Sequence, residues 1–174
     1  MQTLKIGILS DPHRETAFSR RLIDDLKERG ARYLIHAGDF QIPENLEILA
    51  DSGLPYVSVF GNNDMALASM MRTHAIYKEP HYFMIENLRF KLMHLPYYLS
   101  PDEADVIVYG HTHQVKFQYN ENILVLNPGE VCARETGRHE ALLLEVTPER
   151  YTLTRLFYEA GRPALNEHVT EFDR

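Results

Sequence analysis

The chain has 174 residues, a length typical of one domain, and its 44% hydrophobic and 25% charged residues are ordinary for a soluble globular protein. A formal net charge of −7 argues against a broad basic surface for extended nucleic acid. No apolar run approaches the roughly 18 residues of a membrane span, and the apolar start is too short for a signal peptide. We therefore expect a cytoplasmic protein with no membrane partner.

The first half of the chain alternates between apolar runs and amphipathic runs. Three apolar runs are predicted to be strands: residues 4–9, 33–36 and 56–60. Residues 17–28 carry apolar side chains at helical spacing and end before Gly30, and residues 43–50 begin at Pro43, so both are predicted helices. This order predicts parallel strands joined by crossover helices.

Paired apolar runs dominate the second half, as in antiparallel hairpins. The strands predicted there are residues 82–85, 89–94, 106–109, 115–119, 123–126, 142–146 and 151–157. We expect an antiparallel or mixed sheet from them. After Tyr158 the chain carries Gly161, Pro163 and many charges, so residues 1–158 are expected to form one domain and residues 159–174 a C-terminal surface extension.

The only cysteine is Cys132, which excludes an internal disulfide and a thiolate zinc site. The chain holds nine histidines, so a metal site would be built from His, Asp, Glu and Asn side chains. The acidic net charge does not exclude an enzyme that acts on phosphates, because bound cations reverse the local charge.

Polar side chains follow five of the predicted strands at the point where each strand ends. These clusters are Ser10-Asp11-Pro12-His13, Gly38-Asp39, Gly61-Asn62-Asn63-Asp64, His94 and Gly110-His111-Thr112-His113. In an open α/β sheet, sites form at the carboxyl ends of the strands, so we expect these clusters to meet. Their three glycines are expected to permit tight turns.

Carboxylate, imidazole and amide-oxygen donors together suit manganese, iron, zinc or nickel better than calcium. Seven such donors occur in these clusters: Asp11, His13, Asp39, Asn62, His94, His111 and His113. They are too many for one tetrahedral zinc and fit two metals that share a carboxylate, the clamp used for in-line displacement at phosphorus. Each motif alone could also be a turn or a surface pair, so the hypothesis depends on the complete ordered set.

As a set, these motifs resemble those of the calcineurin-like metallophosphoesterases, most closely the small bacterial and archaeal phosphodiesterase branch related to the retromer subunit Vps29. The resemblance runs from about residue 4 to residue 158, and Asn127-Pro128-Gly129 also matches that branch. It implies an α/β fold, a four-layer α/β/β/α sandwich with two mixed β-sheets, and two divalent metal ions, with manganese favoured over nickel, iron or zinc.

The resemblance also implies which residues would hold the metals. The implied ligands are Asp11, His13 and His113 for one metal, Asn62, His94 and His111 for the other, and Asp39 as the bridge. A hydroxide between the metals would attack phosphorus in line, opposite the leaving alkoxide. The expected protein is therefore a binuclear metal-dependent phosphodiesterase.

Three positions near these motifs raise questions about catalysis. Asn63 stands where many relatives have a histidine, and an amide cannot donate a proton as an acid. Good leaving groups would then be favoured, unless another acid serves. We expect Asp64 to orient a ligand or a neighbouring histidine. Arg14, where relatives usually carry glycine, could reach the phosphate or point to solvent.

The candidate catalytic residues are thus Asp39, Asn63 and Asp64, and the candidate substrate contacts are Arg14, Asn62 and Asn63.

Two further departures concern the later motifs. His94 is followed by Leu95-Pro96, and only 15 residues separate His94 from Gly110, so the helix between them is expected to shrink to a turn near residues 100–104. Glu130 stands where relatives often have serine and would repel a phosphate dianion if it faced the site, in which case Arg134 could compensate.

The remaining histidines are expected to have no ligand role. His36 is predicted to pack or to support the ligands, and four are predicted at the surface: His74, His81, His139 and His168.

Two alternatives to a phosphodiesterase remain open. One is a non-catalytic Vps29-like scaffold, in which some ligands would be replaced; the presence of all seven favours catalysis. The other is a phosphomonoesterase or nuclease. The acidic charge and the lack of a second domain favour a small phosphoester substrate, and a homo-oligomer is left open.

Overall fold

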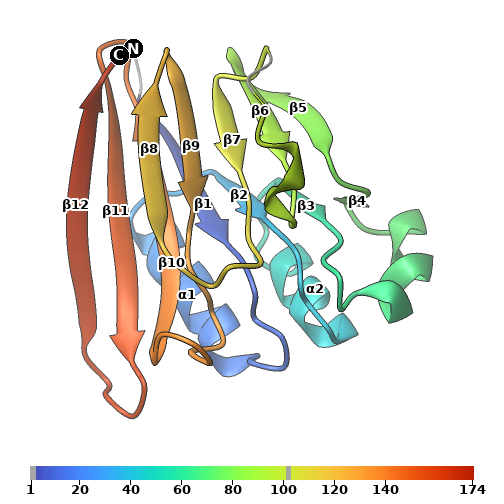
Figure 1. Cartoon of the computed structure of the whole chain (residues 1–174). Coiled ribbons are helices and arrows are strands. Elements are labelled where there is room, and N and C mark those ends of the chain that lie inside the picture. The colour runs from blue at the N-terminus through green and yellow to red at the C-terminus, as the bar shows by residue number, and fades with distance from the viewer. Residues whose placement is uncertain (1–2, 101–102) are drawn as a thin grey trace.

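The computed structural model describes residues 3–100 and 103–174. Two β-sheets pack face to face, and the α-helices cover the outer face of the larger sheet (Figure 1). The larger sheet has seven strands in the order β12-β11-β10-β1-β2-β3-β4, and the smaller has five in the order β5-β6-β7-β9-β8. The expected α/β fold with two mixed sheets is confirmed.

The first half follows the predicted alternation of parallel strands and crossover helices. Its elements are β1 (Leu4–Leu9), α1 (Ala17–Glu28), β2 (Tyr33–His36), α2 (Pro43–Ala50) and β3 (Tyr56–Val59). Strands β1, β2 and β3 pair in parallel, as predicted. Two elements were not predicted: the 3₁₀ helix η1 (Met65–Arg72) and the short parallel strand β4 (Ile76–Tyr77).

The second half contributes strands to both sheets. Its strands are β5 (His81–Ile85), β6 (Leu88–Leu92), β7 (Val106–Val108), β8 (Lys116–Asn120), β9 (Ile123–Asn127), β10 (Arg138–Val146), β11 (Arg150–Glu159) and β12 (Leu165–Asp173). In the smaller sheet β7 lies parallel to β6 and β9, whereas β5 and β8 pair antiparallel at its edges. Strand β10 pairs antiparallel with β1 and so joins the larger sheet.

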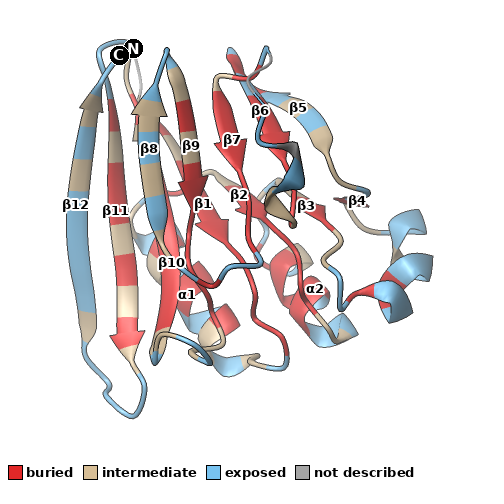
Figure 2. Cartoon of the chain, viewed as in Figure 1, coloured by how far each residue is buried: buried red, intermediate tan, exposed pale blue. Residues whose placement is uncertain are grey.

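The main core lies between the two sheets. Ile8 and Ile35 from the larger sheet meet Phe90, Val106 and Leu124 from the smaller one, and all are essentially inaccessible. Burying one such side chain contributes about 1.5–3 kcal/mol. The central strands, which are mostly buried in Figure 2, form the platform from which the loops of the site project.

The fourth layer, over the outer face of the smaller sheet, is thin. Met93, Ile107 and Tyr109 form a separate buried cluster on that side. Within the described ranges, the connection between β6 and β7 contains one helical turn, the 3₁₀ helix η2 (Pro96–Tyr98). The expected shortening of this helix to a turn is therefore found. The turn lies a few residues before residues 100–104, where we predicted it, and part of that predicted range lies outside the described residues.

The segment predicted as a surface extension is mostly an edge strand. Residues 165–173 form β12, which pairs antiparallel with β11 from Leu165 opposite Tyr158 to Asp173 opposite Arg150. Most of its side chains are exposed, which explains why the sequence lacks the apolar alternation of a buried strand.

Among the described residues, no helix has both the length and the apolar character needed to cross a membrane.

Candidate metal centre

The predicted strand-end clusters meet at one edge of the two sheets. Backbone hydrogen bonds connect them: Asp11 N–H donates to Gly38 O at 3.0 Å, and His13 N–H donates to Asp39 O at 3.0 Å. Gly110 N–H donates to His94 O at 3.1 Å, which connects the ends of β6 and β7. The expectation that these side chains lie together is confirmed.

One group of donors consists of Asp11, His13 and His113. Nε2 of His113 lies 3.4 Å from Asp11 Oδ1 and 3.4 Å from His13 Nε2. Asp11 is buried, and its Oδ2 accepts hydrogen bonds from the Ser10 hydroxyl at 2.5 Å and from His111 N–H at 3.0 Å. Its Oδ1 has no hydrogen-bond partner within the described part of the chain. A buried carboxylate oxygen without a donor is costly, and a cation would satisfy it.

A second group consists of Asn62, His94 and His111. Asn62 Oδ1 lies 2.9 Å from His94 Nε2 and 3.1 Å from His111 Nδ1. Nδ1 of His94 lies 2.8 Å from the carbonyl of Ala37, so Nδ1 carries a proton and Nε2 is the ring nitrogen that faces the site. Burial lowers the pKa of His94, but the contacts with Asp39 and the charge of Asp11 outweigh it and raise the pKa. A cation that displaced the proton on Nε2 would find the imidazole nitrogen and the Asn62 oxygen side by side.

Asp39 lies between the two groups, where a bridging ligand is expected. Its Oδ2 is 3.8 Å from His13 Nε2 and 3.5 Å from His94 Nε2. Asn63 supports both oxygens, because its N–H donates to Oδ1 at 2.9 Å and its Nδ2 donates to Oδ2 at 2.7 Å. Burial alone would raise the pKa of Asp39, but the contacts with His94 and Asn63 outweigh it and hold the pKa well below its usual value. The side chain is therefore an ionised carboxylate.

The backbone adopts an unusual conformation at several donors. Five of them have φ between 51° and 65°: Asp11, His13, Asp39, His111 and His113. Non-glycine residues rarely adopt this left-handed conformation, and such strain costs about 1–3 kcal/mol per residue. The surrounding hydrogen bonds must hold it in place, which is typical of a functional site.

This conformation corrects one expectation about His111 and His113. If the chain were extended there, side chains two apart would face the same way. Strand β7 has already ended at Val108, and both histidines have left-handed φ. The two rings nevertheless point into the site, His111 towards Asn62 and His113 towards Asp11, so they join the two different groups.

The glycines before the donors are needed mainly because the loops of the site pack closely together, and less because the chain turns there. Gly38 has φ +94°, but Gly61 and Gly110 do not have positive φ. A Cβ at Gly61 would overlap the Asp39 carboxylate, and a Cβ at Gly110 would overlap the Ser10 hydroxyl and lie 2.8 Å from Asp11 Oδ2. These positions must lack a side chain for the loops to pack together.

Asp64 lies beneath the site and bonds to backbone. Its Oδ1 accepts from Gln41 N–H and its Oδ2 from Gly61 N–H, both at 2.7 Å. These bonds tie the loop after Asp39 to the loop before Asn62. Burial is the main cause that raises its pKa. Asp64 therefore fixes two loops, instead of orienting a ligand or a histidine directly as we expected.

Glu130 was predicted to disturb phosphate if it faced the site, but it faces His113. It is completely buried, and its Oε2 lies 2.5 Å from His113 Nδ1. Its Oε1 accepts from the N–H groups of Glu135 at 2.8 Å and Thr136 at 2.7 Å. Burial would raise its pKa, but the bonds from Thr136, Cys132 and His113 lower it to about 2. The pKa of His113 rises to about 11, with the Asp11 carboxylate as the largest cause.

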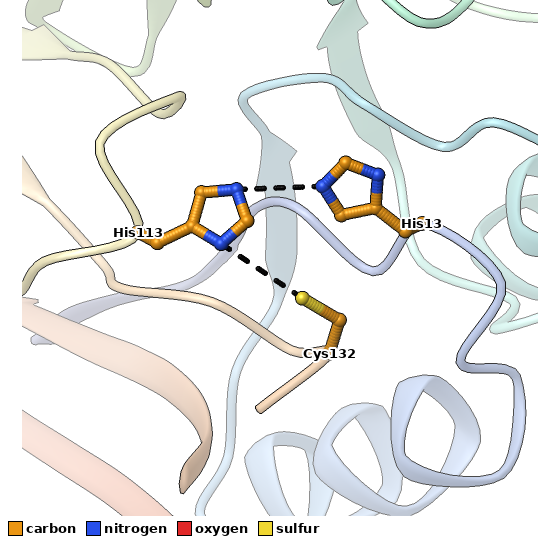
Figure 3. A group of neighbouring side chains, drawn as sticks. All are labelled: His13, His113 and Cys132. Carbon is orange, nitrogen blue, oxygen red and sulfur yellow. Dashed lines mark hydrogen bonds between the residues drawn. The ribbon is translucent and has the colours of Figure 1, made fainter. Parts of the chain in front are cut away.

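Cys132 completes this neighbourhood on the far side of the His113 ring. His113 lies between His13 and Cys132 in Figure 3 and turns a different ring nitrogen to each. The Sγ of Cys132 lies 3.9 Å from His113 Nδ1 and donates to Glu130 Oε2 at 3.0 Å. His13, His113 and Cys132 also form a geometric group of possible metal donors, so the expectation that a single cysteine keeps sulfur out of the site was wrong. A single cysteine carries no spacing signal, so the sequence did not predict this contact.

Two residues that hold the loops of the histidines, Glu79 and Asn127, were also assigned no role from the sequence. Glu79 Oε2 accepts from His94 N–H at 2.6 Å and Leu95 N–H at 2.8 Å, and nothing in the sequence pointed to it. Asn127 Nδ2 donates to Gly110 O at 2.9 Å and Thr112 Oγ1 at 3.0 Å. The Asn-Pro-Gly segment did mark Asn127, but not its role.

Exposed side chains border the donors. Asn62 and Asn63 are exposed, as is Arg14, directly after His13. Arg134 is exposed too, and its charge adds to the effect of burial in lowering the pKa of His13. Arg14 and Arg134, which the sequence analysis also named, thus remain candidate phosphate contacts.

His36 packs below the site, as predicted. Its ring stacks on Phe40 with centroids 3.9 Å apart, and its Nδ1 accepts from Gly38 N–H at 3.2 Å. Burial lowers its pKa to about 3, so the folded protein holds His36 neutral.

The surface assignment of the remaining histidines was only partly correct. His168 is exposed, whereas His74 and His81 are half-buried. The surface prediction was wrong for His139, which is 7% exposed and stacks on Phe18 with ring centroids 3.5 Å apart. Strand β10 begins earlier than predicted and carries His139 under helix α1.

Sequence comparisons identify relatives over most of the chain. The family model of the calcineurin-like phosphoesterase superfamily domain matches residues 4–149. Phosphodiesterase MJ0936 of Methanocaldococcus jannaschii is 27% identical over 160 residues, which cover 85% of this chain and 96% of that protein. Phosphodiesterase YfcE of Escherichia coli K12 is 26% identical over 153 residues, which cover 77% of this chain and 83% of YfcE.

Solved structures share the fold. Vacuolar protein sorting 29 from Cryptosporidium parvum has a TM-score of 0.79 at 18% identity, covering 99% of each chain. A structure described as a novel archaeal phosphodiesterase has a TM-score of 0.75 at 24% identity, covering 96% of this chain and 100% of that one. Since the family model spans both sheets and the converging strand ends, this chain belongs to the calcineurin-like phosphoesterase superfamily.

Proposed function

We propose that the protein is a metal-dependent phosphodiesterase that hydrolyses a small phosphodiester. The observation that carries this proposal is the position of Asp39 between two donor groups, one around Asp11 and the other around Asn62. The names of the M. jannaschii and E. coli relatives support a diester as the substrate.

The donor set fits two divalent cations. Within the described residues, Asp11 offers a buried oxygen without a hydrogen-bond partner, and the Asn62 oxygen lies 2.9 Å from Nε2 of His94. We propose the ligands that the sequence predicted: Asp11, His13 and His113 for one cation, Asn62, His94 and His111 for the other, and Asp39 for both. Bound cations would activate water and neutralise charge on the phosphoryl oxygens. Manganese remains the favoured metal, with nickel, iron or zinc as alternatives.

The chain's own residues position the substrate and the bridging carboxylate. Asn63 fixes Asp39 through two hydrogen bonds, which is a positioning role more than acid catalysis. Arg14, Asn62 and Asn63 are proposed to contact the phosphate, and Arg134 joins them. Since the amide of Asn63 cannot protonate a leaving alkoxide, we propose that diesters with good leaving groups react fastest.

A Vps29-like scaffold is the alternative that the structural likeness favours, because the parasite Vps29 shares the fold over nearly the whole chain. The retained donors favour catalysis instead. A phosphomonoesterase or nuclease would use the same site. We further propose a cytoplasmic protein that acts on a small phosphoester, with a homo-oligomer as a possible assembly.

The test is hydrolysis of an aryl phosphodiester by metal-free protein reconstituted with manganese. We expect turnover of the diester and slower turnover of the corresponding monoester. Absence of turnover with manganese, nickel, iron and zinc alike would reject the enzyme and leave the scaffold.

A further inference from the structure

Glu130 is a completely buried carboxylate whose two oxygens have different partners. Oε1 is fixed by the backbone N–H groups of Glu135 and Thr136 and by the Thr136 hydroxyl at 2.9 Å. The side chain therefore cannot turn freely. Its Oε2 is held 2.5 Å from His113 Nδ1, where it can accept the ring N–H. A buried carboxylate is costly unless it is paired and hydrogen-bonded, and here both oxygens have partners.

This contact determines which nitrogen of His113 faces the donor group. Nε2 lies 3.4 Å from both Asp11 Oδ1 and His13 Nε2, so a cation bound there would displace the proton on Nε2 while Glu130 keeps the proton on Nδ1. A carboxylate that accepts the other ring N–H fixes the tautomer and makes the imidazole a stronger metal donor.

Within the described residues, the rings of His94 and His111 contact no carboxylate other than the shared Asp39, and Glu79 accepts from backbone N–H groups instead of a ring. His94 directs its Nδ1 to the neutral carbonyl of Ala37, and its neighbours Asn62 and His111 are uncharged when they bind a cation. Apart from the shared Asp39, the two groups therefore differ by two carboxylates: Asp11, which lies among the donors, and Glu130, which lies behind His113.

We propose that Glu130 is a positioning residue that orients His113, and that it makes the group of Asp11, His13 and His113 the tighter of two unequal cation sites, the one that fills first. This inference rests on the proposed function, because it assumes that the seven donors hold two cations.

The test is titration of manganese into metal-free protein by calorimetry, comparing wild type with Glu130→Gln. An amide cannot accept from both His113 and the 135–136 backbone with the same geometry. We expect two unequal sites in wild type, and in Glu130→Gln an affinity of the tighter site reduced by about 10–100-fold with little change at the weaker site. The matched control is Glu135→Gln, which removes an exposed carboxylate from the same loop and should titrate like wild type.

A second measurement does not depend on the variant. In zinc-loaded wild type, nitrogen NMR should show His113 with its proton on Nδ1 and the metal on Nε2. Thermal unfolding of the metal-free proteins should show that Glu130→Gln is folded at the titration temperature.

Each result has a distinct meaning. Wild type that binds no cation rejects the proposed function and, with it, this inference. Wild type that binds two cations while Glu130→Gln binds them equally well rejects only the inference. Coordination of zinc through Nδ1 of His113 also rejects the inference, because Glu130 would then have no ring proton to accept.

Discussion

Asn63 holds Asp39 by two hydrogen bonds, from its backbone N–H to Oδ1 at 2.9 Å and from its side-chain Nδ2 to Oδ2 at 2.7 Å. Oδ2 is also the oxygen that lies nearest both His13 and His94. Asn63 thus acts on the proposed bridging carboxylate.

Asn63→Ala should keep the backbone bond and lose the side-chain bond. A hydrogen bond to a charged group contributes about 1.5–3 kcal/mol, so we expect kcat/KM for an aryl phosphodiester to fall by about tenfold or more. Asn63→Asp should lower it further, because it places a second carboxylate beside Asp39. Steady-state kinetics measure both, and an aspartate variant as active as the alanine variant would contradict the account.

Gly110→Ala should damage the site through steric overlap. The new Cβ would overlap the Ser10 hydroxyl and lie 2.8 Å from Asp11 Oδ2, so we expect a loss of about 1–3 kcal/mol in unfolding free energy together with weaker manganese binding. Denaturant unfolding and calorimetry measure the two effects.

The matched control is Gly137→Ala. Gly137 has φ +70°, and a Cβ added there would have no atom within 4 Å, so alanine adds backbone strain without overlap. It should lower stability by about 1 kcal/mol and leave manganese binding unchanged. If both variants lost manganese equally, close approach at Gly110 would not be the reason.

His36 should make the metal-free protein sensitive to acid. Burial lowers its pKa from 6.5 to about 3, so below pH 6.5 the unfolded chain binds a proton that the folded chain does not. The contribution of neutral His36 is present above pH 6.5 and is lost as the pH falls towards 3. Between pH 6 and pH 4, wild type should lose about 1.4 kcal/mol per pH unit more than His36→Gln.

Denaturant unfolding in the presence of a chelator measures this difference. If the free energy of unfolding depended on pH in the same way in both proteins, His36 would take up its proton as readily in the folded protein as in the unfolded chain, which would contradict the prediction.

The sequence predicted which side chains lie together, because strand ends are readable from local patterns. Asp11, Asp39 and His94 each follow an apolar run, and parallel pairing brings the ends of such runs to one edge. Local patterns do not fix side-chain direction in loops. The left-handed φ values of His111 and His113 replaced the expected alternation, and the loop at residues 130–136 turned Glu130 inward.

Elements with weak apolar signals were also missed. Strand β12 buries few side chains at its sheet edge, so its sequence resembles a charged tail. His139 looked like a surface residue because the apolar run of β10 begins only at Ala141, although pairing with β11 extends the strand back to Arg138.

The most direct test of the central claim is the manganese stoichiometry of activity in wild type and Asp39→Asn. Diesterase activity of metal-free wild type should rise until two manganese ions are bound per chain. Asp39→Asn keeps the shape of the side chain but loses the shared charge, so it should lose turnover and bind manganese more weakly. Full activity in Asp39→Asn, or full activity of wild type with one manganese ion, would contradict a site that is bridged by Asp39.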